Sequence, residues 1–210
     1  TAWETGRIGQ SLWALPWQID TRTWFYWRPA LERAGIREDA AFASYDQIER
    51  TVAALTACGQ IAVVGPTSVS LNTLHCVATW LWSLGGELMS SSGDCVLFDQ
   101  PEALEAIERF FRLYLGLARS SLAERCRAGL PEGEADHVFL DRQAAMIQSG
   151  PWIVDKVAAL GSTALDDLGI AACPGVPYTG GTSLVIWRRS LEEQVAVDLD
   201  AGVTLAVSLD

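Results

Sequence analysis

The sequence predicts an α/β fold, in which helices cover a sheet that is largely parallel or mixed. Short runs of β-branched and aromatic residues predict strands, and longer segments with apolar residues at helical spacing predict helices. The two kinds of segment alternate along most of the 210 residues, without an internal repeat or a low-complexity tract. This alternation is typical of a sheet with helices packed on its faces.

The N-terminal part of the chain predicts strands followed by a short helix. Residues 10–15 and 19–27 read as two strands that cross near Pro16, since β-branched and aromatic residues recur on both sides of it. The segment RPALERAGI, residues 28–36, predicts a helix that ends at Gly35, because glycine is the usual residue just beyond a helix C-terminus.

Residues 44–65 predict a helix and then a strand. Ser44 and Gln47 stand in the capping-box relation, and the apolar residues that follow recur at helical spacing, which predicts a helix over 45–57. IAVVG, residues 61–65, predicts a buried strand.

Two helices are predicted between residues 71 and 115. The first runs from Leu71 to Leu84 and ends at the pair Gly85–Gly86. The second begins at Asp99 or Gln100, before Pro101, and has an apolar stripe. The stripe consists of Leu104, Ile107, Phe111 and Leu115.

The next segments predict a surface connection, a short helix and further strands. AERCRAGLPEGEAD, residues 123–136, is polar and rich in turn residues, which favours a surface connection. HVFLDRQAAMIQS predicts a short helix and a strand, AAMIQ, that leads to a helix cap at Ser149 or Gly150, with Pro151 as the helix start. LGIAACPG and TSLVIWRR predict two more strands, the second directly after Gly180–Gly181.

Composition excludes several classes of partner. The net charge of −11, with few and scattered basic residues, argues against binding of nucleic acids or of anionic membrane surfaces. The segment TAWETGRIGQ lacks the features of a signal peptide, which leaves a cytoplasmic protein and an exported chain without its signal as alternatives. Five cysteines without a C-x-x-C pair argue against structural zinc and leave buried free thiols or one or two disulfides.

Catalytic, cofactor and metal motifs are absent from the sequence. It contains no G-x-S-x-G, no G-x-G-x-x-G after a strand and no Walker loop, and His75 and His137 are too isolated to form a metal site. The adjacent carboxylates Asp166 and Asp167 read as solvated residues of a loop. The sequence therefore predicts a protein that is not an enzyme and has no catalytic residue, no cofactor and no metal.

The segment QSGPWIV, residues 148–154, places Trp152 in the first turn of a predicted helix. There an indole lies beside backbone N–H groups that have no partner inside the helix, which suits a polyhydroxylated ligand. The alternative is an ordinary core aromatic.

Several segments, taken in order over residues 9–190, resemble the carbohydrate-binding, maltose-binding-protein-like family of ABC-importer solute-binding proteins. The resemblance rests on motifs of that family such as D-T-x-x-x-x-Y-N, F-x-S-P-E-A and F-x-x-G-K-A-A-M-x-x-x-G-P-W. The matching segments are LPWQIDTRTWFYWRPALERAGI, WLWSLGGELM with VLFDQPEALEAIERFFRLY, FLDRQAAMIQSGPWIV, and GGTSLVIWRRS. The chain departs from the family at Arg142, where the family has glycine, and at Trp27–Arg28, where it has asparagine.

The resemblance implies a periplasmic-binding-protein-like (type II) lobe with a mixed sheet flanked by helices, in an incomplete bilobal architecture. Residues 1–20 would form the end of lobe one and the first hinge strand, 21–182 the second lobe, and 183–210 the second hinge strand and the return to lobe one. It implies an extracytoplasmic protein, periplasmic or lipid-anchored, that binds a sugar or oligosaccharide between lobes and delivers it to the membrane permease subunits. We also expect the chain to self-associate through apolar surface on its hinge strands.

The resemblance also assigns ligand-binding residues. Asp20 falls at a hinge acid that accepts hydrogen bonds from sugar hydroxyls, and Trp152 at a stacking platform. The other residues assigned to the ligand site are Trp17, Asn72, His75, Gly181 and Thr182. Two alternatives stay open at this stage for single residues, namely Asp20 as a surface residue paired with Arg22, and His75 as a core histidine.

Two other functions remain as alternatives. One is a sugar-processing enzyme domain that uses Asp20 as acid or base. The other is the effector domain of a regulator, which would need a DNA-binding module that these residues do not contain.

Overall fold

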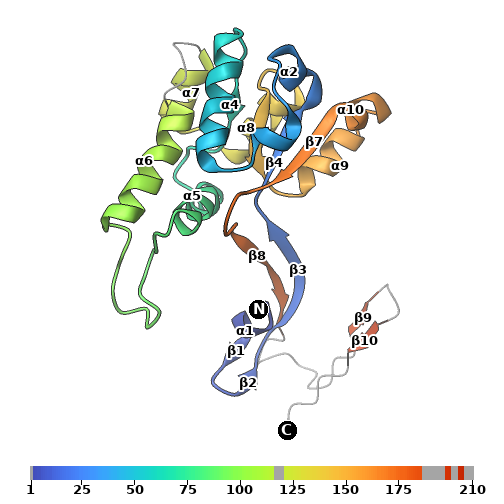
Figure 1. The fold of residues 1–210 in the computed structure, drawn as a ribbon. Coiled ribbons are helices and arrows are strands. Elements are labelled where there is room, and N and C mark those ends of the chain that lie inside the picture. The colour runs from blue at the N-terminus through green and yellow to red at the C-terminus, as the bar shows by residue number, and fades with distance from the viewer. Residues whose placement is uncertain (1, 116–120, 186–196, 200–202, 206–210) are drawn as a thin grey trace. The chain divides into compact units, whose positions relative to one another are not determined.

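The computed structural model describes residues 2–115, 121–185, 197–199 and 203–205 (Figure 1). The chain divides into two compact units, which are described separately below. The larger unit is Asp20–Thr179, and the smaller one combines Thr1–Ile19 with Gly180–Asp210.

A four-stranded mixed sheet forms the centre of the larger unit, in the order β5–β6–β4–β7. The short strand β5 (Val63–Val64) runs parallel to β6 (Met146–Ser149). Strand β4 (Thr23–Trp27) lies antiparallel to both β6 and β7 (Leu168–Ala172). The mixed α/β sheet predicted from the sequence is thus confirmed.

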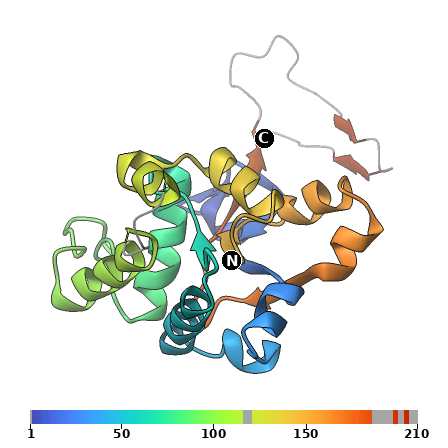
Figure 2. The same ribbon diagram turned by 90° about the horizontal axis from the view of Figure 1, so that it is seen from above.

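Helices cover this sheet on both sides, as the view from above shows, with α5–α7 on one side of the strands and α9–α10 on the other (Figure 2). The helices of the larger unit are α2 (Arg28–Arg33), α3 (Glu38–Ala41), α4 (Tyr45–Ala57), α5 (Leu71–Ser83), α6 (Pro101–Leu115), α7 (Ser121–Gly129), α8 (Glu132–Leu140), α9 (Trp152–Ala158) and α10 (Ser162–Asp167).

Local signals set the helix ends where the sequence predicts them. The Ser44 hydroxyl accepts a hydrogen bond from the Gln47 backbone N–H at 3.1 Å and so caps α4. Beyond α2, Gly35 adopts a φ of +66°, and beyond α5, Gly85 adopts a φ of +87°. Glycine takes up this conformation without a steric penalty, and so both helices end there.

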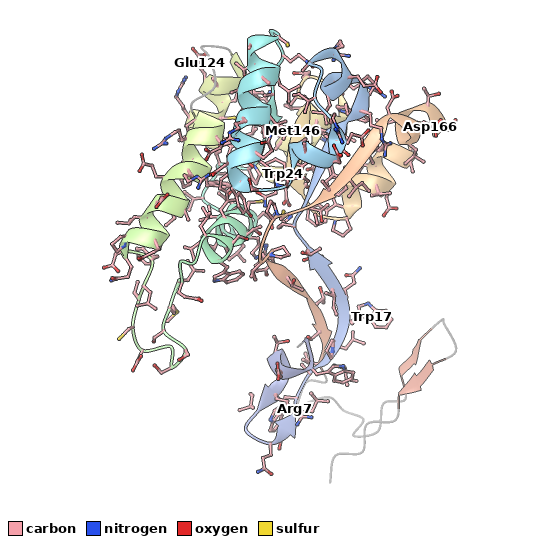
Figure 3. All side chains as sticks on the ribbon, in the orientation of Figure 1. Arg7, Trp17, Trp24, Glu124, Met146 and Asp166 are labelled. Atoms are coloured by element: carbon pink, nitrogen blue, oxygen red, sulfur yellow. The ribbon has the colours of Figure 1, made fainter. Side chains whose placement is uncertain are left out.

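The core lies on both faces of β4 and β6. Trp24 and Phe25 on β4 are at most 1% exposed, as are Met146 and Ile147 on β6 (Figure 3). Burial of β4 on both faces accounts for its nearly continuous apolar sequence, whereas β6 is buried as well but ends in the polar residues Gln148 and Ser149.

The stretch 123–136 corrects a prediction, because it forms most of α7 and half of α8 instead of a surface connection. Leu122, Cys126 and Leu130 recur every four residues and are all buried. This spacing is that of one helix face, and the turn residues between them, such as Gly129, hid it.

The predicted apolar stripe of α6 is correct in part, because Ile107, Phe111 and Leu115 are partly buried and pack against the core. Leu104 is 51% exposed, while Ala103 and Ala106 are fully buried, on the same face as Phe110 and Tyr114. Small residues are needed on this face because α6 packs closely on the end of α5: a Cβ at Gly86 would lie 2.9 Å from the Ala103 Cα. The close approach of the two backbones accounts for the small residue at Ala103.

Three strand and cap predictions were wrong in detail. Pro16 does not separate two strands but lies within β3 (Leu15–Thr21), whose partner among the described residues is β8 (Thr179–Leu184). Gly180–Gly181 lie inside β8, not before it. Ser149 ends β6 and does not cap α9, which Pro151 precedes.

The smaller unit contains short elements only. The helix α1 (Ala2–Thr5) precedes a hairpin of β1 (Arg7–Ile8) and β2 (Ser11–Leu12), and β9 (Val197–Leu199) pairs with β10 (Val203–Leu205). The boundaries of this unit fall within β3 and β8. Of the strand predicted at 182–189, residues 186–189 lie outside the described residues.

The five cysteines are free thiols, with Cys76, Cys126 and Cys173 buried and with Cys58 and Cys95 exposed. Of the two alternatives for the cysteines, the structure therefore shows free thiols and no disulfide. Only three of the five thiols are buried. In the described part of the chain, no helix is long and apolar enough to cross a bilayer.

Candidate functional site

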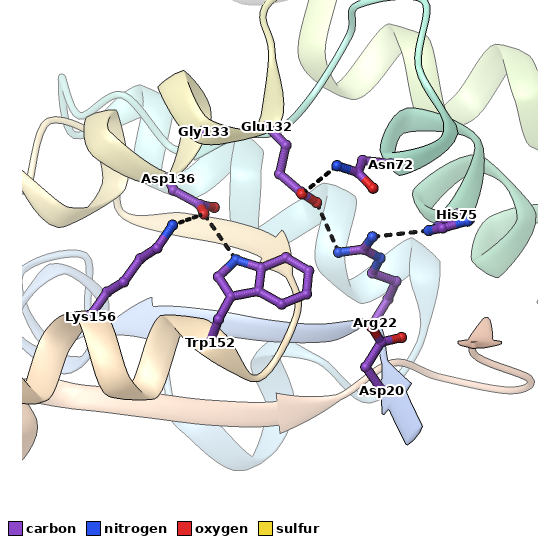
Figure 4. Close-up of a pocket in the computed structure, with 9 residues that line it drawn as sticks. All are labelled: Asp20, Arg22, Asn72, His75, Glu132, Gly133, Asp136, Trp152 and Lys156. Atoms are coloured by element: carbon purple, nitrogen blue, oxygen red, sulfur yellow. Dashed lines mark hydrogen bonds and ion pairs between the residues drawn. The ribbon is translucent and has the colours of Figure 1, made fainter. Parts of the chain in front are cut away.

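The ends of three helices and one strand meet around a pocket of about 370 Å³ in the larger unit (Figure 4). We call it the Trp152 pocket. Its lining residues lie at the end of β3, in the first turns of α5, α8 and α9, and one turn further along α8 and α9. They are Asp20, Arg22, Asn72, His75, Glu132, Gly133, Asp136, Trp152 and Lys156.

Trp152 is partly exposed and held in place on several sides. Its indole N–H donates a hydrogen bond of 2.9 Å to Oδ2 of Asp136. The Arg22 guanidinium lies 5.0 Å from the centre of the ring. Gly150 leaves room for the ring, since a Cβ there would come within 2.0 Å of it.

Asp136 is a buried carboxylate, with its side chain only 2% exposed. Burial of an unpaired carboxylate is costly, and three donors compensate for it here. The Ser149 hydroxyl donates to Oδ1 at 3.1 Å, and the Trp152 indole and the Lys156 ammonium donate to Oδ2 at 2.9 and 2.6 Å. Trp152 and Lys156 are one turn apart on α9, so this one carboxylate fixes both.

Arg22 lies at the floor of the pocket and is 3% exposed. Its guanidinium donates to Glu132 Oε1 at 2.9 Å and to His75 Nδ1 at 3.1 Å, while its buried Nε–H has no partner among the described residues. Asn72 donates to the other oxygen of Glu132 at 2.6 Å. Burial raises the pKa of Glu132, and the charge of Arg22 opposes this effect only in part.

The position of His75 fixes its tautomer. Since a guanidinium can only donate, His75 Nδ1 must accept, and its proton is then carried on Nε2. The ring stacks on Tyr178 with centres 3.9 Å apart. Burial first and the nearby Arg22 second lower the pKa of His75, and Asp20 acts in the opposite direction. His75 is therefore a neutral N–H donor at neutral pH.

Asp20 lines the pocket, and its carboxylate has neither a hydrogen bond nor an ion pair with any described side chain. The alternative in which it pairs with Arg22 is wrong, because Arg22 pairs with Glu132. Asp20 therefore remains free to accept hydrogen bonds from a ligand.

The structure brings together some of the residues that the sequence predicts for the site. Asp20, Asn72, His75 and Trp152 all line the pocket. The others lie in the smaller unit: Trp17 on β3, where it is 51% exposed, and Gly181 and Thr182 on β8. A Cβ at Gly181 would lie 1.9 Å from the Gln18 carbonyl oxygen, so this glycine permits close pairing of β8 with β3.

Sequence reasoning missed Arg22, Glu132, Asp136 and Lys156. Glu132 and Asp136 lie in the stretch that was predicted as a surface connection. A usable signal was the position of Asp136 between Ala135 and Val138, which are apolar positions of one helix face. A carboxylate on such a face must find donors.

The pocket can bind a ligand by hydrogen bonds and by contact with an aromatic ring. It contains three carboxylates and two cations, and both cations are already ion-paired. Among the described residues no cluster of histidine, cysteine or carboxylate groups could hold a metal ion.

The chain is similar in structure to ABC-transporter solute-binding proteins. No family model and no curated protein sequence matches it. A solute-binding protein from Thermotoga lettingae TMO, bound with alpha-D-tagatose, matches 90% of this chain and 49% of its own, with 22% identity and a TM-score of 0.76. Maltose-bound MalE3 of T. maritima matches 89% of this chain and 48% of its own, with 22% identity and a TM-score of 0.72.

A further solute-binding protein, from Agrobacterium vitis S4 with bound D-mannitol, matches 81% of this chain and 40% of its own. Its identity to this chain is 16% and the TM-score is 0.64. These matches establish the fold, a type II periplasmic-binding-protein-like lobe with a mixed sheet flanked by helices, and so confirm the expected fold class. The chain spans about half the length of the first two of these proteins.

Proposed function

We propose that this chain binds a sugar or sugar alcohol in the Trp152 pocket, as part of a solute-binding protein of an ABC importer. One observation carries the proposal: a partly exposed indole, fixed by a charged acceptor, lies in the same pocket as the unpaired Asp20 carboxylate. An indole face packs against the C–H groups of a sugar ring, and a carboxylate accepts hydrogen bonds from hydroxyl groups.

The charges of the pocket favour a neutral ligand. Arg22 and Lys156 are neutralised by Glu132 and Asp136, whereas Asp20 has no ion-pair partner in the described part of the chain. An acidic sugar would meet no free cation and would face the Asp20 carboxylate, and like charges at close range repel. Hydroxyl groups can instead donate to Asp20 and accept from the His75 Nε2–H.

The fold supports the wider setting of the proposal. The similar structures are solute-binding proteins of transporters, with tagatose, maltose or mannitol bound. By analogy, the chain would act outside the cytoplasm, release its ligand to membrane permease subunits and catalyse no reaction. Trp17, Gly181 and Thr182 stay proposed ligand contacts.

Calorimetric titration with tagatose, maltose, mannitol and ribitol tests the proposal. We expect at least one of them to bind unchanged, and Asp20→Asn to weaken that binding by about tenfold, the effect of losing one charge-assisted hydrogen bond. Asp166→Asn is the matched control, since Asp166 is exposed on α10 and outside the pocket. New products on chromatography would support the enzyme alternative, and binding that Asp20→Asn leaves unaltered would contradict the proposal.

A further inference from the structure

The buried carboxylate of Asp136 is an unusual partner for an indole. Three tryptophans in the described residues donate indole hydrogen bonds: Trp27 to the Phe139 carbonyl, Trp80 to the Gln148 amide and Trp152 to Asp136. Only the last acceptor carries a charge. Trp27 and Trp80 are also fixed by burial, at 3% and 0% exposure, whereas Trp152 is only partly buried.

A partly exposed indole needs such an anchor to keep one orientation. Packing alone can hold a buried ring: the Trp24 indole N–H is buried and has no hydrogen-bond partner among the described residues, and Trp24 is 0% exposed. The Gly150 backbone and the Arg22 guanidinium lie against the Trp152 ring, but neither is a directional bond that fixes the rotation of the ring about its side-chain bonds. The bond from its N–H to Asp136, at 2.9 Å, is directional and charge-assisted.

Asp136 has little capacity left for a ligand. A carboxylate offers about four acceptor positions, and three donors from Ser149, Trp152 and Lys156 already use it. Its side chain is only 2% exposed. Any effect of Asp136 on a ligand must therefore pass mainly through the side chains that it holds.

We propose that Asp136 is a positioning residue, which holds the Trp152 indole in the orientation that receives the ligand. This inference rests on the proposed function, since it assumes that Trp152 contacts a sugar. Through its Oδ2 the carboxylate ties α8 to α9, so the position of the indole is set by these two helices, whereas Ser149 at the end of β6 donates to the other oxygen, Oδ1. The ligand then meets a ring that is already oriented and loses less entropy on binding.

Two readouts on the full chain test this inference. The first is the dissociation constant of the sugar that binds best, and the second is the indole N–H signal of Trp152 in an NMR spectrum of the ligand-free protein, assigned with Trp152→Phe. In Asp136→Ala we expect the dissociation constant to rise about tenfold. We also expect the Trp152 signal to move to the position of a solvent-exposed indole and its proton to exchange faster.

Ser149→Ala is the matched control, because it removes a donor from the same carboxylate, and Ser149 does not line the pocket. It should leave the Trp152 signal in place and the dissociation constant within about twofold. The variant Trp152→Phe has no indole N–H. In that background, Asp136→Ala should raise the dissociation constant of the sugar by less than about twofold. Asp136→Asn keeps an acceptor oxygen, so its dissociation constant and its Trp152 signal should lie between those of the wild type and Asp136→Ala. It serves as the test variant if Asp136→Ala fails to fold.

The possible failures are distinct. Absence of sugar binding by the wild-type chain would contradict the proposed function, and with it the ligand part of this inference. An unmoved Trp152 signal in Asp136→Ala, or in Asp136→Asn if that variant is used, would overturn the positioning role even if sugars bind. So would an equal loss of affinity in the wild-type and Trp152→Phe backgrounds.

Discussion

The tryptophans of this chain show how one residue type takes different roles at the scale of single side chains. Trp80 is fully buried and packs against Tyr45 in a tilted arrangement and against Phe110 edge to face, whereas Trp152 lies at a pocket with part of its ring exposed. The sequence identifies Trp152 because a helix-start signal precedes it. It does not identify the carboxylate that holds it, since that partner lies 16 residues away on another helix.

The two roles predict different effects of truncation. Trp80→Ala should lower the free energy of unfolding by about 3–5 kcal/mol, the range for a buried aromatic, and Trp152→Ala by about 2 kcal/mol, since only part of its ring is buried. By contrast, Trp152→Ala should weaken sugar binding more than tenfold, because it removes the stacking surface. Urea unfolding and calorimetric titration measure the two quantities. A large loss of stability together with unchanged affinity would assign Trp152 to the core.

His75 predicts a pH dependence of stability with a definite sign. Its folded-state pKa is lowered, chiefly by burial, so below about pH 6.5 the unfolded chain takes up a proton that the folded chain resists. Because of His75, the free energy of unfolding should decrease as the pH falls from about 6.5 through the lowered pKa. Above about pH 6.5, His75 should not change the free energy of unfolding. Urea unfolding at about pH 7.5 and 5.5 should show a smaller loss for His75→Gln than for wild type.

His137→Gln is the control for this comparison, because His137 is exposed on α8 and outside the pocket. Its loss of stability between the two pH values should match that of the wild type. If His75→Gln behaves in the same way as His137→Gln, the assigned environment of His75 is wrong.

At the scale of elements, most helices follow from local signals, and the exceptions have physical reasons. Caps and glycines at Ser44, Gly35 and Gly85 act within a few residues, so the sequence alone predicts those ends. The small residue at Ala103 on α6 depends on how closely the end of α5 approaches, which no local pattern contains. Helices α7 and α8 were missed because a few apolar positions lie among many charged and turn residues.

The candidate site shows the same division. Trp152 is predicted from the local helix-start signal, and the family resemblance assigns Asp20, Asn72 and His75; all four line the pocket. Arg22 and the α8 carboxylates could not be predicted, because the sequence does not show that the connection between β3 and β4 meets α8 around one pocket.

The turn between α8 and β6 contains Arg142, which has a φ of +57°. The family that the chain resembles has glycine at this position. Its guanidinium ion-pairs with Asp167 at 2.7 Å and lies 4.2 Å from the Trp27 ring, which offsets the backbone strain. Arg142→Ala removes these contacts and keeps the strain, and should destabilise by about 1–2 kcal/mol. Arg142→Gly removes the contacts and relieves the strain, and should be more stable than Arg142→Ala by about 1 kcal/mol.

Chemical denaturation of the two variants tests this account of the turn. Asp167→Asn, which removes only the ion pair, should cost less than about 1 kcal/mol because both partners are partly exposed. Equal stability of Arg142→Ala and Arg142→Gly would show that the positive φ carries no cost.

At the scale of the whole molecule, net charge and exposed apolar surface have opposite effects on association between copies of the chain. The net charge of −11 keeps copies of the chain apart. The smaller unit nevertheless exposes large apolar side chains between the first hairpin and the end of β3. The apolar side chains of β4, which the sequence also predicted for the exposed hinge surface, are buried. The exposed residues are Leu12, Trp13, Trp17 and Ile19.

This balance predicts self-association that increases with salt. Trp13 and Trp17 are 63% and 51% exposed, and apolar side chains gathered in this way favour contact between copies. Salt screens the repulsion between the negative chains, so sedimentation velocity should show more dimer or larger species at high ionic strength. The double variant Trp13→Glu/Trp17→Glu should weaken association at least tenfold, whereas Leu104→Glu, at an equally exposed site on α6, should change it little. A wild-type chain that stays monomeric at high concentration and high salt would contradict the prediction, because nothing would then oppose contact between the exposed tryptophans.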